Sequence, residues 1–414
     1  MNANPTLEAC HWTRAAPFGH RCRMLRRRKP SRNSFADGGP WRSGNRFHLL
    51  AVSEAYFERM LGAIDGAGEY VLMEMYLVES GELADRFVAA LARAAARGLG
   101  VCLALDGFGS LGLATADRTR LRQAGVDLRF YNALSWRKQL LQNFRRDHRK
   151  LLIVDGRLAF VGGAGLTDEF AGVRGKGPPW RDQMVEISGP VLIDWQRAFA
   201  QTWRRCGGTL QLPEPPQKVG EESVGASGRV ALSEAAARSV IARDVVHRIE
   251  NARERAWVMS AYFVPSRRFR KALRRTARRG VDVRLLVPGP LTDHPWVRDA
   301  ARRFYGKMLR NRVRIFEYQP RVLHGKMTIC DDWVSVGSSN LDRWSFKWNL
   351  EANQEIMDAA FAADAAEVFE NDCRQADELS TRHWPRRALF HRVRERIAGV
   401  LDRWLDRWRR PNAP

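Results

Sequence analysis

The sequence lacks the features that would place it across a membrane or in an oxidising compartment. No stretch approaches about 18 uninterrupted apolar residues, so we expect no transmembrane helix. The N-terminus has no apolar segment typical of a signal peptide. The cysteines are scattered without C-x-x-C pairs, as expected of reduced thiols in a cytosolic setting. They are Cys10, Cys22, Cys102, Cys206, Cys330 and Cys373.

Acidic residues are scarce relative to basic ones. The chain of 414 residues contains 46 Asp and Glu against 69 Lys and Arg, which gives a net charge of +23 at pH 7. This balance favours anionic partners such as nucleic acid, anionic lipid or a phosphorylated substrate, and charge alone does not choose among them. The hydrophobic content of 45% is ample for the buried cores of two or three domains.

One motif, H-x-K-x(4)-D, occurs twice, each time on an apolar run followed by a glycine-rich turn. Its members are His148, Lys150 and Asp155 in the first copy and His324, Lys326 and Asp331 in the second. In an extended strand alternate side chains share a face, so the His and Lys of each copy point the same way. An imidazole and an ammonium group thus lie side by side twice, which suits the binding of an anion. No Asp/His cluster with metal-ligand spacing lies near either copy, so we expect neither a metal nor another cofactor.

Helices and strands alternate from Asn45 onward, which indicates an α/β fold with a largely parallel sheet covered on both faces. The periodicity predicts a helix over 53–67, a strand over 70–78, a helix over 81–97, a strand over 100–105, a helix over 116–123 and a strand over 127–131. Ligands are expected at the carboxyl ends of such strands.

The same order of elements begins again after a stretch rich in Pro and Gly. It predicts a helix over 233–251, a strand over 256–264, a helix over 266–279 and strands over 281–287 and 313–318. The predicted organisation is a basic mobile extension (1–44), a first domain (45–212), a linker (213–228), a second domain (229–381) and a C-terminal segment (382–414). Two similar domains should face each other about a pseudo-twofold axis, with both His-Lys pairs in one cleft at their interface.

Two His-Lys pairs in one cleft suit phosphodiester cleavage through a covalent intermediate. One neutral imidazole attacks phosphorus, and the other, protonated, serves as the acid for the leaving alkoxide. The two lysines neutralise the developing charge. This mechanism requires the two histidines to titrate differently.

With its glycine turns, this repeated motif resembles that of the phospholipase D superfamily, and most closely its bacterial cardiolipin synthase branch of the non-transmembrane type. Further stretches that carry the resemblance are Gly44-Asn45-Arg46, Asp106-Gly107-Phe108-Gly109-Ser110, Phe160-Val161-Gly162-Gly163, Trp180-Arg181-Asp182, Gly337-Ser338-Ser339-Asn340-Leu341-Asp342 and Asn349-Leu350-Glu351-Ala352-Asn353. The resemblance implies two phospholipase D-like α-β-α sandwich domains. It also implies a transferase that passes a phosphatidyl group, through a phosphatidyl-histidine, to a hydroxyl of phosphatidylglycerol or a related alcohol.

The resemblance also implies roles for residues around the motifs. Asp182 and Glu351 are the carboxylates that orient the histidines, and Gly163, Ser339 and Asn340 are the phosphate-binding residues. The motif aspartates, Asp155 and Asp331, rank below the His and Lys residues as catalytic candidates, because in the family they mainly have a structural or orienting part.

Two departures from the family pattern accompany the resemblance. Gly165 stands where the branch usually has Asn, so a phosphate contact is missing or is supplied elsewhere. Five residues separate Asp331 from Gly337, against six between Asp155 and Gly162. The shorter spacing is either absorbed by a tighter hairpin or distorts the site.

The segment 386–410 has an apolar stripe with arginines at its edges, which predicts a basic amphipathic helix. We expect it to hold the protein, as a monomer, on the cytoplasmic surface of the bacterial inner membrane, where the anionic phospholipid substrate lies. The alternative is a terminal helix packed on the protein. His294 lies either near the cleft or in an ordinary loop.

Three other functions remain open from the residues alone. The same histidines could act in a phospholipase D-type hydrolase or a nucleic-acid phosphodiesterase, which the positive charge would suit, although the amphipathic segment makes nucleic acid the less favoured partner. A degenerate binding protein is favoured only by the two departures.

Overall fold

The computed structural model describes residues 38–135, 143–173, 175–210, 225–234, 239–382 and 384. Most of the predicted basic extension, most of the predicted linker and the predicted C-terminal amphipathic helix lie outside the described residues.

The first half alternates strands and helices and ends on a long helix. Its elements are β1 (Arg42–Leu50), α1 (Ser53–Asp65), β2 (Tyr70–Met75), α2 (Glu82–Ala96), β3 (Gly100–Asp106), α3 (Thr115–Gln123), β4 (Asp127–Tyr131), β5 (Arg146–Asp147), β6 (Lys150–Val154), β7 (Leu158–Gly162), α4 (Asp168–Ala171), β8 (Met184–Ser188) and α5 (Leu192–Arg205).

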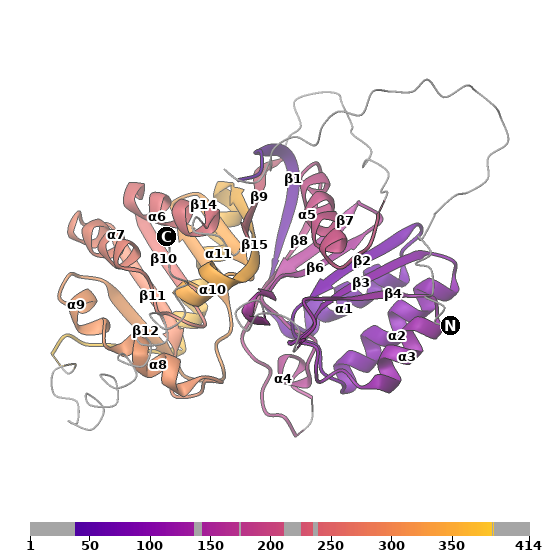
Figure 1. Cartoon of the computed structure of the whole chain (residues 1–414). Helices are drawn as coiled ribbons and strands as arrows, with labels where there is room; N and C mark the ends of the chain where they lie inside the picture. The colour runs from indigo at the N-terminus through magenta and orange to yellow at the C-terminus, as the bar shows by residue number, and fades with distance from the viewer. Residues whose placement is uncertain are drawn as a thin grey trace, which may run out of the picture.

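The second half repeats this order with small additions (Figure 1). Its elements are β9 (Ala226–Glu234), α6 (Val240–Asn251), β10 (Arg255–Ser260), α7 (Arg267–Arg278), β11 (Asp282–Pro288), α8 (Pro295–Arg302), α9 (Tyr305–Leu309), β12 (Arg314–Tyr318), β13 (Lys326–Cys330), β14 (Trp333–Gly337), α10 (Arg343–Trp348), β15 (Asn349–Met357), α11 (Ala359–Arg374) and β16 (Ala376–Glu378).

The strands join into one sheet that runs through both halves. The order is β16-β12-β11-β10-β13-β14-β15-β9-β1-β8-β7-β6-β2-β3-β4, with β5 paired to β15, so β9 and β1 link the halves at the centre. Strands β2, β3 and β4 are parallel, as are β10, β11 and β12. The remaining strands of each half are antiparallel to their neighbours, apart from the short β5, so the prediction of a largely parallel sheet was wrong. Because the motif strands turn back on themselves in the hairpins β6–β7 and β13–β14, they must pair antiparallel.

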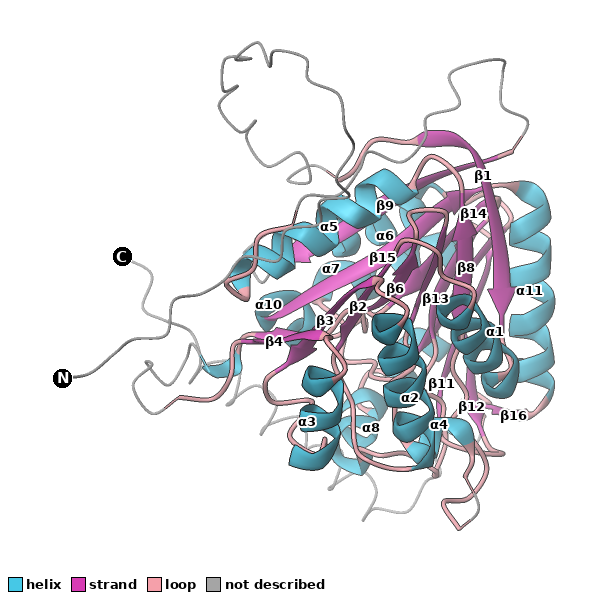
Figure 2. Cartoon of the chain, turned by 90° about the vertical axis from the view of Figure 1, so that its right-hand side faces the viewer, coloured by secondary structure: helices cyan, strands magenta, loops and turns pink. Residues whose placement is uncertain are grey.

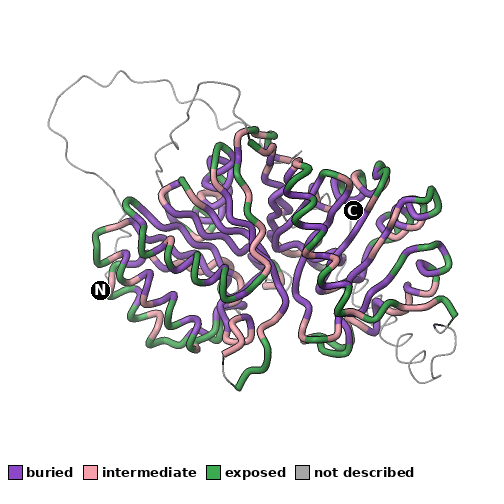
Figure 3. Tube along the Cα trace, turned by 180° about the vertical axis from the view of Figure 1, so that it is seen from behind, coloured by how far each residue is buried: buried purple, intermediate pink, exposed green. Residues whose placement is uncertain are grey.

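Helices cover both faces of each half (Figure 2). The outer faces carry separate cores, one built with α1 and α2 and the other with α6 and α7. The inner helices α5 and α11 share a single core, in which Trp195 and Phe199 pack in the same cluster as Phe361 and Phe369. Buried chain is continuous across the junction (Figure 3), so the two α-β-α halves form one body.

The predicted helix over 233–251 was wrong at its start. Ser233 and Glu234 end β9, and the helix α6 begins at Val240. The segment ALSEAAAR is a good local helix former, but β9 pairs with β15 over eight residues, from Ser227 to Glu234, and this tertiary pairing outweighs local propensity.

The one-residue difference between the motif copies falls in the hairpin turns. Three residues separate the paired Val154 and Leu158, whereas two separate the paired Cys330 and Trp333. At the other end of the hairpins, Gly162 pairs with Met184 and Gly337 pairs with Asn353 in equivalent positions. The tighter turn therefore absorbs the deletion and leaves the histidine end unchanged.

Candidate active site

A cavity of about 660 Å³ lies between the halves and is lined by residues of both. His148, Lys150 and His324 lie on its wall, together with mainly apolar side chains. Each histidine lies two residues before the start of its motif strand. Since β6 and β13 are antiparallel to β2 and β10, their first residues lie at the carboxyl ends of those parallel strands, with Lys150 opposite Met75 and Lys326 opposite Ser260. Both histidines therefore lie at the edge of the sheet where a ligand was expected.

Backbone hydrogen bonds carry each histidine to the opposite half. Strand β5 pairs in parallel with β15, and the His148 N–H donates to the Leu350 carbonyl at 2.9 Å. Reciprocally, the His324 N–H donates to the Arg181 carbonyl at 2.8 Å. Leu350 and Arg181 directly precede the two predicted orienting carboxylates, so this exchange positions each carboxylate beside the histidine of the other half.

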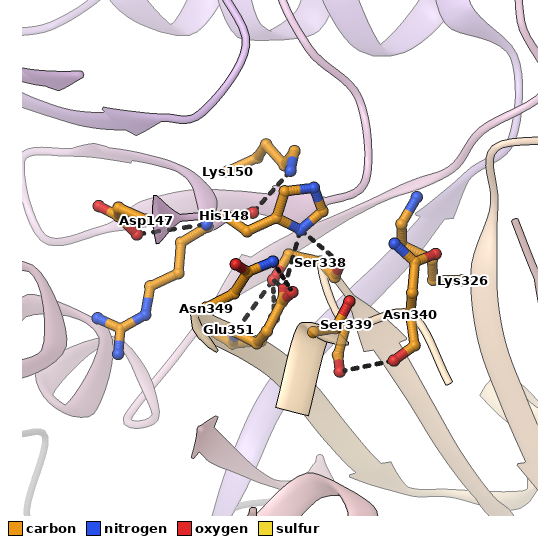
Figure 4. Close-up of polar contacts among 12 residues, drawn as sticks. Asp147, His148, Lys150, Lys326, Ser338, Ser339, Asn340, Asn349 and Glu351 are labelled. Atoms are coloured by element: carbon orange, nitrogen blue, oxygen red, sulfur yellow. Dashed lines mark hydrogen bonds and ion pairs between the residues drawn. The ribbon is translucent and has the colours of Figure 1, made fainter. Parts of the chain in front are cut away.

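His148 is held at one ring nitrogen by two acceptors of the second half (Figure 4). Its Nδ1 lies 3.1 Å from Glu351 Oε2 and 3.2 Å from the Ser338 carbonyl. Ser338 Oγ in turn donates to the same Glu351 oxygen at 2.5 Å. A proton on Nδ1 satisfies these acceptors, which leaves the Nε2 lone pair available.

His324 is held by one carboxylate of the first half. Its Nδ1 lies 2.6 Å from Asp182 Oδ2. The rings of Phe170 and Trp180 flank it at 5.1 and 5.6 Å between centroids. The two histidines therefore have the same kind of partner, supplied in each case by the opposite half.

The motif lysines lie against their own histidines. Lys150 Nζ donates to the His148 carbonyl at 2.6 Å, and Lys326 Nζ donates to the His324 carbonyl. Burial lowers the pKa of Lys150 to about 7, and burial also lowers the pKa of Lys326. Each ammonium group is thus poorly solvated and would gain from an anion in the cavity.

Burial favours the neutral form of both imidazoles. Burial lowers the pKa of His148 to about 4, against the opposing effect of Glu351. Burial, and then the neighbouring Lys326, lower the pKa of His324. The sequence-based prediction requires one histidine to be protonated, and in this site that form needs an added negative charge, which a phosphodiester would supply.

Comparison with known proteins agrees with the two-copy architecture. Residues 60–172 and 245–373 match the family described as "Cardiolipin synthase, PLD-like domain". Cardiolipin synthase A of Pseudomonas aeruginosa is 36% identical over 346 residues, which cover 82% of this chain and 69% of that protein. Cardiolipin synthase A of Pseudomonas putida is 34% identical over 367 residues, covering 88% and 75%.

The chain belongs to the cardiolipin synthase family of phospholipase D-like proteins. Solved structures show the fold at larger distance. Phosphatidylserine synthase from Haemophilus influenzae matches with a TM-score of 0.66 at 12% identity, over 87% of this chain and 93% of that one. Polyphosphate kinase from Porphyromonas gingivalis matches with a TM-score of 0.55 at 12% identity, over 81% and 48%. The predicted family and fold class are confirmed.

The motif aspartates of this cardiolipin synthase family member do not lie in the cavity. Asp155 accepts hydrogen bonds at 2.8 Å from the backbone N–H groups of Gly68, Glu69 and Tyr70. Asp331 likewise accepts from three consecutive N–H groups, those of residues 253–255, at 2.9 to 3.1 Å. Both occupy the hairpin turn, five residues beyond the motif lysine and roughly 16 Å along the strand from it. In this position they fix the strand to the preceding loop, and a part in the chemical step stays a prediction for them.

The predicted phosphate-binding residues are placed differently from one another. Gly163 lines the cavity, and a Cβ there would lie 2.5 Å from Asp182 Oδ1, so glycine is required by the close approach of the orienting carboxylate. Asn340 also lines the cavity, and its buried Oδ1 has no hydrogen-bond partner among the described residues. Ser339 is buried, its N–H donates to Asn353 Oδ1 at 3.2 Å, and it does not line the cavity.

Gly165 does line the cavity, at the place equivalent to Asn340 in the second half. A Cβ there would meet Leu77 Cβ at 3.0 Å, so the position is narrow. Asn340 is then the one amide that this pair of positions offers to a ligand within the described residues.

The sequence reasoning missed the aromatic walls. The ring centroids of Tyr76 and His148 are 4.7 Å apart, and Lys150 Nζ lies 5.0 Å from the Tyr76 ring centroid. Tyr262 lies 6.2 Å from His324. Tyr76 follows the buried strand β2 by one residue and Tyr262 follows β10 by two, and this repeated tyrosine after equivalent strands was the available signal. His294, which was left open, lies on the cavity wall.

The described residues contain neither a metal-binding cluster nor a membrane-spanning helix. No group of three or more His, Cys, Asp or Glu in them is arranged to hold a metal ion. Within the same residues, no helix combines the length and hydropathy needed to cross a bilayer.

Proposed function

We propose that this phosphatidyltransferase forms cardiolipin from phosphatidylglycerol or a related phospholipid donor, with His148 and His324 as its reacting groups. The observation that carries the proposal is the reciprocal arrangement of two histidines on one cavity, each oriented at Nδ1 by a carboxylate from the other half. Neither half contains a complete site, so the duplication itself is what creates the chemistry.

In the first step, the Nε2 lone pair of His148 attacks the phosphorus of the donor. A P–N bond forms and the bond from phosphorus to the headgroup oxygen breaks. The departing alkoxide takes a proton from His324, which the anionic phosphate has made easier to protonate. His148 is the proposed nucleophile because its pKa, lowered to about 4, keeps it neutral, and because two acceptors fix its tautomer.

In the second step, the hydroxyl of an acceptor replaces the headgroup. Neutral His324 takes the hydroxyl proton while the oxygen attacks phosphorus, and the P–N bond to His148 breaks. Atoms and charges balance without an added reactant. Asp182 stabilises the imidazolium form of His324 in both steps.

The negative charge on the non-bridging phosphate oxygens is stabilised by positive groups that have no other anionic partner. Lys150 and Lys326 are buried, and the cost of that burial is relieved when a phosphate binds between them. Asn340 adds an amide on the cavity wall that would donate to a phosphate oxygen when its NH₂ group faces inward.

Exposed hydrophobic side chains near the edge of the cavity suggest that the reaction takes place at a membrane surface. Large hydrophobic side chains, 49 to 57% exposed, gather in the loops after β3, β4 and β11 and at the start of α8; they are Phe108, Leu111, Leu134, Leu291 and Trp296. These loops leave the carboxyl ends of the strands, where the cavity lies, and Phe108 and Trp296 line it. Apolar side chains in this position suit the interface of a bilayer. Trp296→Ser should lower co-sedimentation with phosphatidylglycerol vesicles, and unchanged binding would contradict this part.

The functional test uses the full chain with phosphatidylglycerol vesicles and product analysis by mass spectrometry. Cardiolipin and glycerol are the expected products. Phosphatidic acid alone would indicate the hydrolase, and cleavage of DNA without any lipid product would overturn the lipid assignment. The attachment by segment 386–410, the cytoplasmic side of the inner membrane and the monomeric state remain predictions.

A further inference from the structure

One part of the cavity wall has no counterpart in the other half. After β11 the chain reads Thr292-Asp293-His294, and both Asp293 and His294 line the cavity. The equivalent loop after β3 begins Gly107-Phe108-Gly109 and contributes the ring of Phe108. The wall therefore carries a carboxylate and an imidazole on the His324 side that the proposed reaction does not use.

Asp293 is linked to His324 through a tyrosine. Tyr262 Oη donates to Asp293 Oδ2, and the Tyr262 ring lies 6.2 Å from the ring of His324 and 5.2 Å from that of His294. Thr292 Oγ1 lies 3.4 Å from Asp293 Oδ1, and His294 Nε2 lies 3.7 Å from Asp293 Oδ2. The side chain of Asp293 is 18% exposed and that of His294 is 50% exposed, so the two extend from the reacting end toward the opening.

The charge of this pair selects its ligand. A carboxylate on the wall repels the phosphate of a donor lipid, so phosphate is not its partner. Two carboxylate oxygens accept about four hydrogen bonds, and Tyr262 and Thr292 use only part of that capacity. The remaining acceptor sites call for a neutral ligand rich in hydroxyl groups, and the imidazole of His294 can donate to or accept from the same groups.

We propose that Asp293 and His294 bind the neighbouring hydroxyl groups of a polyol acceptor and so select it over simple alcohols and water. This assignment rests on the proposed transferase function, and it names the chemical class of the acceptor, a glycerol-type headgroup. Tyr262 is a positioning residue that holds the carboxylate. The location is consistent with the direction of the reaction, because the acceptor must present its hydroxyl to His324, the histidine on this side.

The test compares two soluble acceptors of equal carbon number, deuterated glycerol and 1-propanol, supplied together to the full chain with phosphatidylglycerol vesicles. Wild type should favour the triol. Asp293→Asn should reduce the ratio of labelled phosphatidylglycerol to phosphatidylpropanol about tenfold, the loss expected for one hydrogen bond to a charged acceptor. Tyr262→Phe should reduce it less, and Asp332→Asn, which alters an exposed carboxylate in the distant hairpin turn, should leave it unchanged.

Three outcomes would decide against part of this scheme. An unchanged ratio in Asp293→Asn, or an equal loss of both products, would overturn the hydroxyl-binding assignment and leave the transferase intact. If wild type forms no cardiolipin and transfers to neither alcohol, the proposed function itself fails, whereas cardiolipin without transfer to glycerol would overturn only the polyol assignment. If Asp293→Asn does not fold by circular dichroism, the half-exposed His294→Ala decides by the same ratio, and an unchanged ratio there overturns the assignment.

Discussion

The two histidines have matching partners on the cavity face and unlike surroundings behind it. Behind His148, the buried Arg149 donates to Thr202 at 3.0 Å, and Thr202 donates to the buried Glu74 at 3.0 Å. Behind His324, the equivalent of Arg149 is Gly325, whose Cβ would lie 2.3 Å from Gln183 Oε1. The face away from the cavity therefore carries a buried polar network in the first half, whereas in the second half the side chains of Gln183 and Met259 pack closely against Gly325.

The buried polar groups behind His148 also have shifted pKa values and shared hydrogen bonds. Burial and the neighbouring Glu74 raise the pKa of Asp147, directly before His148, well above its usual range. The Asp147 N–H donates to Asp106 at 2.8 Å, and the same Asp106 side chain accepts from the backbone of the Phe108 loop. The first half thus connects its histidine to the cavity edge through a buried polar network. The second half makes the corresponding connection through Tyr262 and Asp293 on the cavity face.

Removal of either imidazole should have the largest effect on activity. His148→Ala and His324→Ala should each abolish turnover of phosphatidylglycerol, because the histidine that remains cannot serve as both nucleophile and acid.

A lipid with a p-nitrophenyl leaving group, which needs no acid, distinguishes the two roles. With this lipid His324→Ala should still form a covalent adduct, detected on the His148 peptide by mass spectrometry. His148→Ala should form none. An adduct on His324 instead would reverse the proposed roles, and appreciable natural turnover in either variant would contradict a shared site.

The lysines come next. Lys150→Met and Lys326→Met should each lower kcat/KM by about 10²–10³, because each removes a positive charge that stabilises the negative charge developing on the phosphoryl oxygens. Lys150→Met should also change the pH dependence of stability. The folded pKa of Lys150, about 7, lies below its unfolded value of 10.5, so the wild-type free energy of unfolding rises with pH across that window.

Equilibrium unfolding in urea at several pH values measures this effect. The slope of unfolding free energy against pH between 7 and 10 should fall in Lys150→Met by up to about 1.4 kcal/mol per pH unit. The exposed Lys271→Met is the matched control and should keep the wild-type slope. Equal slopes in all three proteins would mean that Lys150 is solvated in the folded state.

Loss of the two carboxylates that contact the histidines should lower activity to unequal extents. Asp182→Asn removes the carboxylate beside His324, so we expect a loss of about 10²–10³ in kcat/KM. Glu351→Gln should cost about tenfold less, because the Ser338 carbonyl still accepts from His148 Nδ1 at 3.2 Å. Steady-state kinetics on vesicles distinguishes the two. Equal losses would show that the Ser338 carbonyl contributes nothing to the orientation of His148.

The sequence predicted local elements well and their long-range pairing poorly. The strand over 127–131 matches β4 residue for residue, and the helix over 116–123 differs from α3 by one residue at its start. These boundaries follow from local periodicity and turn residues. The direction of the motif strands and the existence of β9 depend on pairing with distant chain, which no local pattern reports.

The site divides in the same way. The histidines, the lysines and the two carboxylates that lie beside the histidines were named as candidates by residue number, because repeated motifs and a family resemblance fix them in the chain. Which carboxylate serves which histidine was not predicted. That assignment depends on two backbone crossings, β5 beside β15 and the bridge between Arg181 and Leu323, which exist only once the halves are packed together.

The smallest expected effect on catalysis tests the motif aspartates, which lie far from the cavity in both halves. Asp155→Asn and Asp331→Asn should keep kcat/KM within about twofold of wild type, while each lowers the free energy of unfolding by roughly 1–3 kcal/mol through weakened backbone hydrogen bonds. Burial raises the pKa of Asp331, but its three backbone donors outweigh that effect and hold the pKa below its usual value. Wild type should therefore lose this stabilisation as pH falls below about 4, and Asp331→Asn should lack that part of the loss in urea denaturation. A hundredfold loss of activity in a variant that remains folded would return these residues to the chemical step.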